Sequence, residues 1–460
     1  MLFRVCFLGV LYFSLSTVAK SPGSYEVVKK DVLIVGGGAS GAHAAGGHVD
    51  SYTDPDTGIP YNYGVQNFVE TGNATGFVSR FGIETAPYRR VPTVPRYIDF
   101  STEKEFNYSD PTPEEQRAAL ERYLELCEKY EGLIYPGYWN FPPPENIPED
   151  LIMSFGDFAR KYSIEAAVPT IWRVGVMGSG DVTKEMTFYV MQSFGAVMTR
   201  AFTGRTTSWI VGSERNQILY DAIDEHLDGD VYKSSTIVDA VRDEDGILAV
   251  VKNHKTGKET QIVAKTLVVA IAPTPSNLAP FHLTAEEEEV FEKFNFINMY
   301  AGLVANEALP IGGSVTSVVP GVENPEPENW LAYPETPFTG RFDYFGAEKV
   351  FRVIVPGDST MNDQGARDLI QSDFERMIDA GVLPEPKSRQ IEYVAWESHG
   401  AVHLRASRAD ILEGFIQKKY ALMGTSSTWW TGGAFSMSFQ TSLWEYNDIM
   451  LPKLVESLQK

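Results

Sequence analysis

Short apolar runs closed by glycine or proline are the clearest pattern along this chain. Residues 32–35 and 266–271 are apolar and β-branched stretches, typical of parallel strands buried on both faces. Thr112, followed by Pro113 and two acids, predicts the start of a helix, and residues 216–227 carry apolar side chains at helical spacing. Strands that alternate with helices in this way predict an α/β fold.

The middle of the chain has a different pattern. Residues 151–162 and 184–202 look helical and are rich in methionine and aromatic side chains. We expect a helical region over 111–204 that covers a substrate site, although ordinary core packing accounts for most of its apolar residues.

The later part of the chain returns to short strands. Residues 299–304, 350–355 and 391–396 look like strands separated by proline-rich loops, which predicts a substrate-domain sheet, largely antiparallel, over 286–399. A helix is expected over 407–420.

The first apolar run leads into a glycine-rich turn. Gly36, Gly38 and Gly41 form the motif G-x-G-x-x-G, with small Ala39 and Ser40 opening a helix. In a dinucleotide site one glycine makes the tight turn, one admits the pyrophosphate and one lets the helix pack on the strand. The alternative is a glycine-rich loop that binds no ligand.

The motif breaks off early. The helix meets Gly46 and Gly47 only a few residues after Gly41. In an intact motif the helix continues, a second strand follows, and an acidic residue about 20 positions later binds the ribose.

Several stretches together resemble a known family. They are DVLIVGGGASG, GGHVDSYTDPDTGIPYNYGVQNF, GSERNQILYDAIDEHL, TLVVAIAPTPSNLAPF and TSSTWWTGGAFSM, spread over residues 31–452. In these stretches the chain resembles fungal flavoproteins of the β-cyclopiazonate dehydrogenase type, within the amine-oxidase-like FAD superfamily.

The resemblance implies a fold and a cofactor. The fold would be a glutathione-reductase-like FAD/NAD(P)-binding domain, formed by residues 24–110, 205–285 and 400–460, beside a mixed α+β substrate domain with a helical insertion. Beyond the motif glycines, it implies FAD contacts at Gly46, Gly47, His48, the backbone of Val238, Trp430, Gly432 and Gly433. For Val238 and Trp430 the alternative is a place in the packed core.

The resemblance also implies a reaction. FAD would accept a hydride from a small hydrophobic natural product, in a dehydrogenation or oxidative cyclisation of secondary metabolism. Molecular oxygen would reoxidise the flavin, because no separate nicotinamide fingerprint is present.

One departure from the family stands out between Ala45 and Gly46. The family carries there the rest of the first helix, a strand ending in Glu and a turn, so the βαβ geometry predicts a deletion of roughly 20 to 25 residues. None of the nearby acids (Asp50, Asp54, Asp56 and Glu70) follows an apolar strand run. An inactive relative and an incomplete gene model, neither able to bind FAD properly, are therefore alternatives to an active enzyme.

Composition narrows the function further. The chain has 460 residues and a net charge of −22, and its 39 basic residues are scattered, which argues against binding to nucleic acid. The two cysteines show no spacing typical of a metal site.

The beginning of the chain is typical of a secretory signal. One positive charge precedes an apolar run that is short for a membrane span, and small residues follow. This pattern favours a cleaved signal peptide over 1–19, and a secreted protein, over the alternative of a membrane anchor. Asn73 and Asn107 each begin an N-x-S/T sequon, so we expect a glycoprotein without a stable membrane span after cleavage.

Histidines are few, and the catalytic group is not identified by any motif. His48 follows the glycine doublet, where the resemblance implies a contact with the flavin, either a hydrogen bond to a phosphate or a covalent bond through a ring nitrogen. His399 and His403, expected between a strand and a helix, are candidate proton acceptors, and a structural histidine is the alternative for both.

Overall fold

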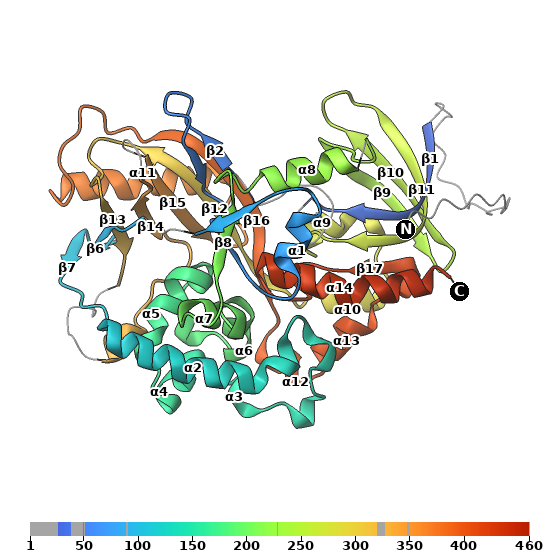
Figure 1. Ribbon diagram of the computed structural model, residues 1–460, viewed down its shortest axis with the longest axis horizontal. Coiled ribbons are helices and arrows are strands. Elements are labelled where there is room, and N and C mark those ends of the chain that lie inside the picture. The colour runs from blue at the N-terminus through green and yellow to red at the C-terminus, as the bar shows by residue number, and fades with distance from the viewer. Residues whose placement is uncertain are drawn as a thin grey trace.

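The computed structural model describes residues 26–37, 49, 51–88, 91–227, 229–319, 327–346 and 350–459. Two sheets lie side by side and are joined by a group of helices below them (Figure 1). The mixed α/β fold predicted from the sequence is confirmed. The expected signal peptide lies outside the described residues. Within them, no helix is both long and apolar enough to cross a membrane.

The first sheet is built around one long strand. Its strands are β1 (Glu26–Val35), β11 (Glu259–Val269), β10 (Gly246–Asn253), β9 (Ser235–Asp243) and β17 (Thr428–Trp430). The first half of β11 pairs antiparallel with β10 and its end pairs parallel with β17, while β1 runs parallel along the other side. The buried parallel strand expected over 266–271 is therefore the end of a longer strand that starts at Glu259 and ends at Val269.

The second sheet contains seven strands. In order they are β16 (Glu392–Arg405), β12 (Asn295–Ala305), β15 (Val350–Gly357), β14 (Arg341–Tyr344), β13 (Gly313–Ser317), β6 (Val94–Asp99) and β7 (Lys104–Phe106). The pair β6 and β13 is parallel and the other pairs are antiparallel. β6 and β7 come from the stretch 24–110 that we expected beside the cofactor. Their pairing places them with the strands of 286–399.

The helices are shorter and more divided than the periodicity predicts. The helices before residue 230 are α1 (Ala74–Ser79), α2 (Pro113–Ile134), α3 (Glu149–Ile152), α4 (Phe155–Tyr162), α5 (Val168–Ile171), α6 (Thr187–Ser193), α7 (Ala196–Phe202) and α8 (Ile218–His226). The later ones are α9 (Pro275–Leu278), α10 (Ala285–Phe291), α11 (Asp363–Asp379), α12 (Arg408–Leu412), α13 (Phe415–Ala421) and α14 (Gln440–Ser457). The expected helix over 407–420 is broken at Gly414, whose φ is +84°.

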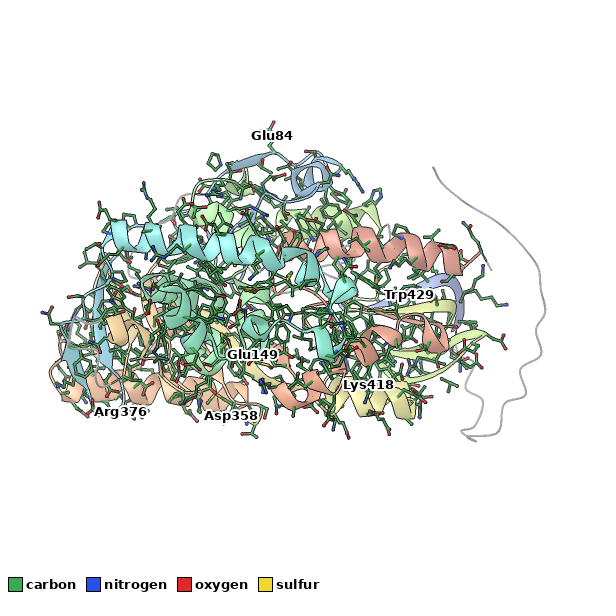
Figure 2. The ribbon with its side chains drawn as sticks, turned by 90° about the horizontal axis from the view of Figure 1, so that it is seen from below. Glu84, Glu149, Asp358, Arg376, Lys418 and Trp429 are labelled. Atoms are coloured by element: carbon green, nitrogen blue, oxygen red, sulfur yellow. The ribbon has the colours of Figure 1, made fainter. Side chains whose placement is uncertain are left out.

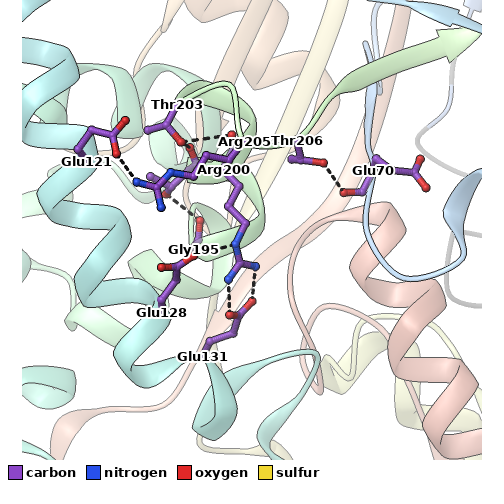
Figure 3. A network of polar contacts seen from close by, with 10 residues as sticks. Glu70, Glu121, Glu128, Glu131, Gly195, Arg200, Thr203, Arg205 and Thr206 are labelled. Carbon is purple, nitrogen blue, oxygen red and sulfur yellow. Dashed lines mark hydrogen bonds and ion pairs between the residues drawn. The ribbon is translucent and has the colours of Figure 1, made fainter.

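The start of α2 agrees with the sequence. Thr112 and Glu115 form a reciprocal capping box. Further along, α2 is joined to α7 by Arg200, whose guanidinium binds both carboxylate oxygens of Glu131 at 2.8 and 2.6 Å and also contacts Glu128 (Figure 3). These contacts hold α2 and α7 together in the helical region below the two sheets.

The remaining strands are short. β2 (Ser51–Thr53) pairs with β3 (Pro60–Asn62), and β8 (Ser208–Val211) pairs with both β4 (Phe68–Val69) and β5 (Thr85–Pro87). β4 contacts α14, where the ring of Phe68 stacks on that of Trp444 with 5.6 Å between the centroids.

Candidate cofactor and active site

Three parallel strands end at the same level of the first sheet. Val35 on β1 is in register with Val269 on β11, and Val269 is in register with Trp430 on β17. Gly36 follows the first strand and Thr431 follows the last. Ligands of open α/β sheets bind beyond the carboxyl ends of parallel strands, so this edge is the candidate site.

Gly36 makes the turn expected of the first motif glycine. Its φ is +116°, and a Cβ atom there would lie 2.8 Å from the Ala270 carbonyl oxygen. The Ala270 N–H donates to the Val35 carbonyl at 2.7 Å, which holds the two strand ends together. Only glycine fits without strain at this position. Gly38, Ala39, Ser40, Gly41, Gly46, Gly47 and His48 lie outside the described residues.

A second glycine turn faces this edge from the C-terminal part of the chain. We call residues 431–436 the C-terminal turn. It starts where the Thr431 N–H donates to the Val269 carbonyl at 3.0 Å, and Gly432 has φ +105°. Among the described residues, no atom lies within 4 Å of the position that a Cβ on Gly433 would take.

Side chains from elsewhere hold the carbonyl groups of the C-terminal turn. Gln192 donates to the Gly433 carbonyl at 2.7 Å and to that of Ser436, while Tyr420 donates to the Phe435 carbonyl. Within the described part of the chain, the N–H groups of Gly432 and Gly433 have no acceptor. Side chains of the protein thus bind the carbonyl groups of this turn, and the N–H groups of Gly432 and Gly433 remain available. A turn of this kind is suited to bind an anion.

The N-terminus of α14 is buried beside this turn and lacks polar partners. Gln440 is 8% exposed and Thr441 1%, yet neither the Gln440 amide nor the Thr441 hydroxyl has a hydrogen-bond partner among the described residues. No side chain caps the helix. Buried polar groups are nearly always paired, so these atoms indicate that a polar ligand belongs here. A helix N-terminus favours an anionic ligand.

Gln440, Thr441 and Gln192 were missed in the sequence. Gln440 and Thr441 follow the glycine doublet of the C-terminal turn within eight residues, and that spacing from a turn to a helix start was the signal available. Gln192 is distant in sequence, and no local pattern points to it.

Trp430 and Val238, the other two expected contacts to FAD, have different surroundings in the structure. Trp430 is fully buried and stacks on Phe435 at 6.1 Å between ring centroids, with Phe291 at 4.6 Å on another side. Its ring is therefore a core element beneath the turn. Val238 is 43% exposed and lies at a bulge, because the register passes from Asp239 to Ile237 without a β10 partner for it. A bulged residue leaves backbone groups available to a ligand.

Two of the described acids near the motif, Asp54 and Glu70, are already engaged. Asp54 accepts hydrogen bonds from the backbone of Asp56 and Thr57 and so closes its own turn. Glu70 accepts from Trp209 Nε1 at 2.8 Å and from Thr75. Asp50 lies outside the described residues. The residues present therefore fit the pyrophosphate and ring end of a dinucleotide, whereas neither Asp54 nor Glu70 is available for its ribose.

Strand β1 is at the edge of its sheet. Among the described strands it pairs with β11 alone, and Val27 and Ile34 are 54% and 41% exposed. An intact dinucleotide fold places its second strand along this edge.

Both candidate histidines lie on β16. The sequence predicted that this strand ends at 396, but it continues to Arg405. His399 is half-buried. His403 has φ +52° and packs so closely on Gly178 that a Cβ there would come within 2.8 Å of the imidazole. Burial, with a smaller contribution from the positive charge of Arg405, lowers the pKa of His403 to about 3. His403 is therefore neutral at physiological pH and is a poor proton acceptor.

A pocket opens between the helical region and the second sheet. Its lining consists mainly of aromatic and small side chains and includes Tyr97, Tyr108, Trp172 and Tyr333. One cation, Arg173, is in its lining and is already paired with Asp110 at 2.5 Å. Such walls suit a small hydrophobic ligand.

Comparison with known proteins agrees with the resemblance found in the sequence. No family model matches the chain. The chain is 29% identical to an FAD-dependent oxidoreductase of Monascus ruber, covering 94% of this chain and 93% of that protein. It is 28% identical to β-cyclopiazonate dehydrogenase of Aspergillus oryzae, covering 98% of each.

Solved structures share the fold at low sequence identity. A fatty acid isomerase of P. acnes superposes with a TM-score of 0.65 at 16% identity, over 94% of this chain and 98% of the isomerase. Cyclohexylamine oxidase of Brevibacterium oxydans gives 0.58 at 14% identity, over 94% and 99%. The resemblance found in the sequence is thus confirmed: over nearly its whole length the chain is similar to fungal FAD-dependent oxidoreductases, including β-cyclopiazonate dehydrogenase, and it has the fold of the amine-oxidase-like flavoproteins.

Proposed function

We propose that this chain is an FAD-dependent oxidoreductase that abstracts a hydride from a small hydrophobic natural product. The observation that carries the proposal is the set of polar groups at the strand edge that have no partner among the described residues. The N–H groups of Gly432 and Gly433, the amide of Gln440 and the hydroxyl of Thr441 all lie at one edge of the sheet or at the start of α14 beside it. They are suited to phosphate and ring oxygens.

The residues of this chain would act by holding and shielding the cofactor. Gly36 and Gly433 permit close approach of the backbone, and the N-terminus of α14 adds a positive dipole. The bulged backbone at Val238 would lie along the nucleotide. FAD, when bound, supplies the acceptor for a hydride.

Two observations support a hydrophobic substrate and a dehydrogenation. The pocket beside Trp172 has aromatic walls, and its one cation is already neutralised. One relative is named for the dehydrogenation of β-cyclopiazonate. We propose oxygen as the final electron acceptor.

The reaction is tested on the purified, flavin-loaded protein. Without oxygen, a substrate should bleach the visible flavin bands, and air should restore them. β-Cyclopiazonate is the first probe, followed by other hydrophobic secondary metabolites. Bleaching by none of them, with the flavin still reducible by dithionite, would contradict the proposed substrate class.

A second candidate is a product that cannot hold FAD, through genuine inactivity or an incomplete gene model. The exposed edge of β1 favours it, since the second strand of an intact fold would cover that edge. The match to the Aspergillus oryzae enzyme spans 473 aligned positions, more than the 460 residues of this chain, so the relative has residues without counterparts here.

Sequencing the transcript across the codons for Ala45 and Gly46 separates the two forms of this candidate. An in-frame insert that encodes a helix, a strand and a Glu would indicate an incomplete gene model. An uninterrupted transcript would show that the deletion is real.

We also propose that the protein is secreted and glycosylated. Asn73 and Asn107, which begin the two sequons, are exposed. Treatment of the secreted protein with an N-glycosidase should lower its apparent mass. Retention inside the cell with no change in mass would contradict this proposal.

A further inference from the structure

A buried lysine lies directly behind the C-terminal turn. Lys419 on α13 is 2% exposed, and its ammonium donates to the Ala434 carbonyl at 2.5 Å. No described carboxylate pairs with it. Instead it is surrounded at 4.8 to 5.8 Å by the ring centroids of Tyr138, Phe294, Phe415, Tyr420 and Phe435.

Burying an ammonium without a counter-ion is costly, and aromatic faces offset only part of the cost. A methionine of similar shape would fill the same space without the charge. Stability alone therefore does not explain a lysine here, which points to a role at the atom that it holds.

That atom belongs to the C-terminal turn. Gln192 holds the carbonyls of Gly433 and Ser436, and Tyr420 holds that of Phe435. Lys419 supplies the donor for Ala434, the one carbonyl between them. With this contact, each carbonyl from Gly433 to Ser436 is directed back into the protein, and the N–H groups of Gly432 and Gly433 are left for a ligand.

We propose that Lys419 is a positioning residue that fixes the Ala434 carbonyl, and with it the orientation of the C-terminal turn toward the cofactor. The ligand it serves is the anionic pyrophosphate or an oxygen of the flavin ring. The assignment to FAD depends on the proposed function, whereas the effect on the turn does not.

The charge of Lys419 gives the proposal a pH signature. Burial lowers its pKa to about 7. The titratable groups that face it are the hydroxyls of Tyr138 and Tyr420, and burial raises both of their pKa values far above neutral. Affinity for an anionic ligand should therefore fall as pH rises through about 7, when the ammonium loses its proton.

The test compares Lys419→Met with Lys418→Met. Lys418 is the adjacent residue and is labelled in Figure 2. It lies at the surface and forms an ion pair with Glu289 at 2.6 Å. Both variants are examined for thermal unfolding, for amide hydrogen exchange without FAD, and for FAD affinity between pH 6 and 8.5. The Phe435 and Ser436 amides, which donate to the Gly432 carbonyl, report on the turn.

We expect Lys419→Met to unfold at the same temperature as the wild type or higher, because a buried charge is removed. Exchange at Phe435 and Ser436 should rise about tenfold, FAD affinity at pH 6 should fall about tenfold, and the pH dependence of affinity should disappear. Lys418→Met should leave all three unchanged. Wild-type exchange at the turn in Lys419→Met would overturn the proposal. A wild-type protein that binds no FAD would instead overturn the proposed function, because the exchange result needs no cofactor.

Discussion

Gly36 and Gly433 both lie at the candidate site, but the space around their α-carbons differs. A Cβ on Gly36 would meet the Ala270 carbonyl oxygen at 2.8 Å, whereas a Cβ on Gly433 meets no described atom within 4 Å. The first glycine is required by the fold itself, and the second leaves space that a ligand would fill.

The two substitutions to alanine should therefore have different effects. Gly433→Ala should keep the melting temperature within about 1 °C and lower FAD affinity at least about tenfold, because the methyl group occupies the ligand's space. Gly36→Ala should destabilise the protein by roughly 1–3 kcal/mol, because it forces a side chain into positive φ against a carbonyl. Thermal unfolding and FAD titration measure both. Unchanged FAD affinity in Gly433→Ala would mean that the turn does not face the cofactor.

His403 makes a prediction about acid stability. Its pKa falls from the usual 6.5 to about 3 in the folded protein, so between these values the unfolded chain binds a proton that the folded chain does not. The contribution of neutral His403 to the free energy of unfolding is fully present above pH 6.5. It is lost as pH falls toward 3, by at most about 1.4 kcal/mol per pH unit.

We expect His403→Asn to reduce this acid sensitivity. Between pH 6.5 and 4.5 the wild type should lose more free energy of unfolding than the variant, as urea unfolding would show. Equal losses would mean that the imidazole reaches solvent and titrates normally. Carboxylates contribute in both proteins, so the difference isolates the histidine.

At the scale of elements, a buried ion pair fastens the first sheet to its neighbours. Arg242 on β9 binds both oxygens of Glu287 on α10, at 2.9 and 2.7 Å, and its guanidinium also reaches the Thr428 hydroxyl on β17 at 2.9 Å. The Arg242 and Glu287 side chains are 2% and 0% exposed.

Breaking this pair should be costly. Glu287→Ala should destabilise the protein by about 3–5 kcal/mol, because it leaves the guanidinium buried without a counter-ion. Glu289→Ala on the same helix is the matched control, since Glu289 pairs only at the surface, and it should cost less than about 1 kcal/mol. Similar losses in urea unfolding for the two variants would show that the pair between β9 and α10 is not buried in solution.

The sequence predicted elements well where the pattern was local. The capping box of α2 forms as predicted, and the apolar runs 32–35 and 266–269 are strand, as predicted. The sequence did not predict the length of a strand where pairing with a distant strand determines it. β16 continues through His399 to Arg405 because β12 offers partners along its whole length, although its residues no longer alternate.

At the scale of the whole molecule, the candidate site combines local and distant parts. Gly36 was predicted because a glycine motif follows an apolar strand, and Gly432 and Gly433 were predicted from the resemblance to the family. Gln192 and Lys419 were not found, because each is brought to the turn by chain folding and carries no local motif. The sequence also could not show that Trp430 lies beneath the turn, in the core.

The proposed deletion makes a prediction about the whole fold. Insertion of the corresponding segment of the Aspergillus oryzae relative between Ala45 and Gly46 should raise FAD affinity by roughly a hundredfold or more, because a ribose carboxylate adds hydrogen bonds worth about 1.5–3 kcal/mol each. It should also raise the melting temperature by covering the edge of β1. FAD titration and thermal unfolding of the two chains measure this, and unchanged affinity would show that nothing needed for FAD is missing.

The central claim is that the edge formed by the ends of β1, β11 and β17 binds FAD in this 460-residue chain. The most direct measurement is the amount of FAD released per folded chain, from the visible spectrum before and after denaturation. We predict a yellow protein that carries or takes up about one FAD per chain and loses this capacity in Gly433→Ala. A cooperatively folded, colourless chain that takes up no FAD when it is added in excess would contradict the claim.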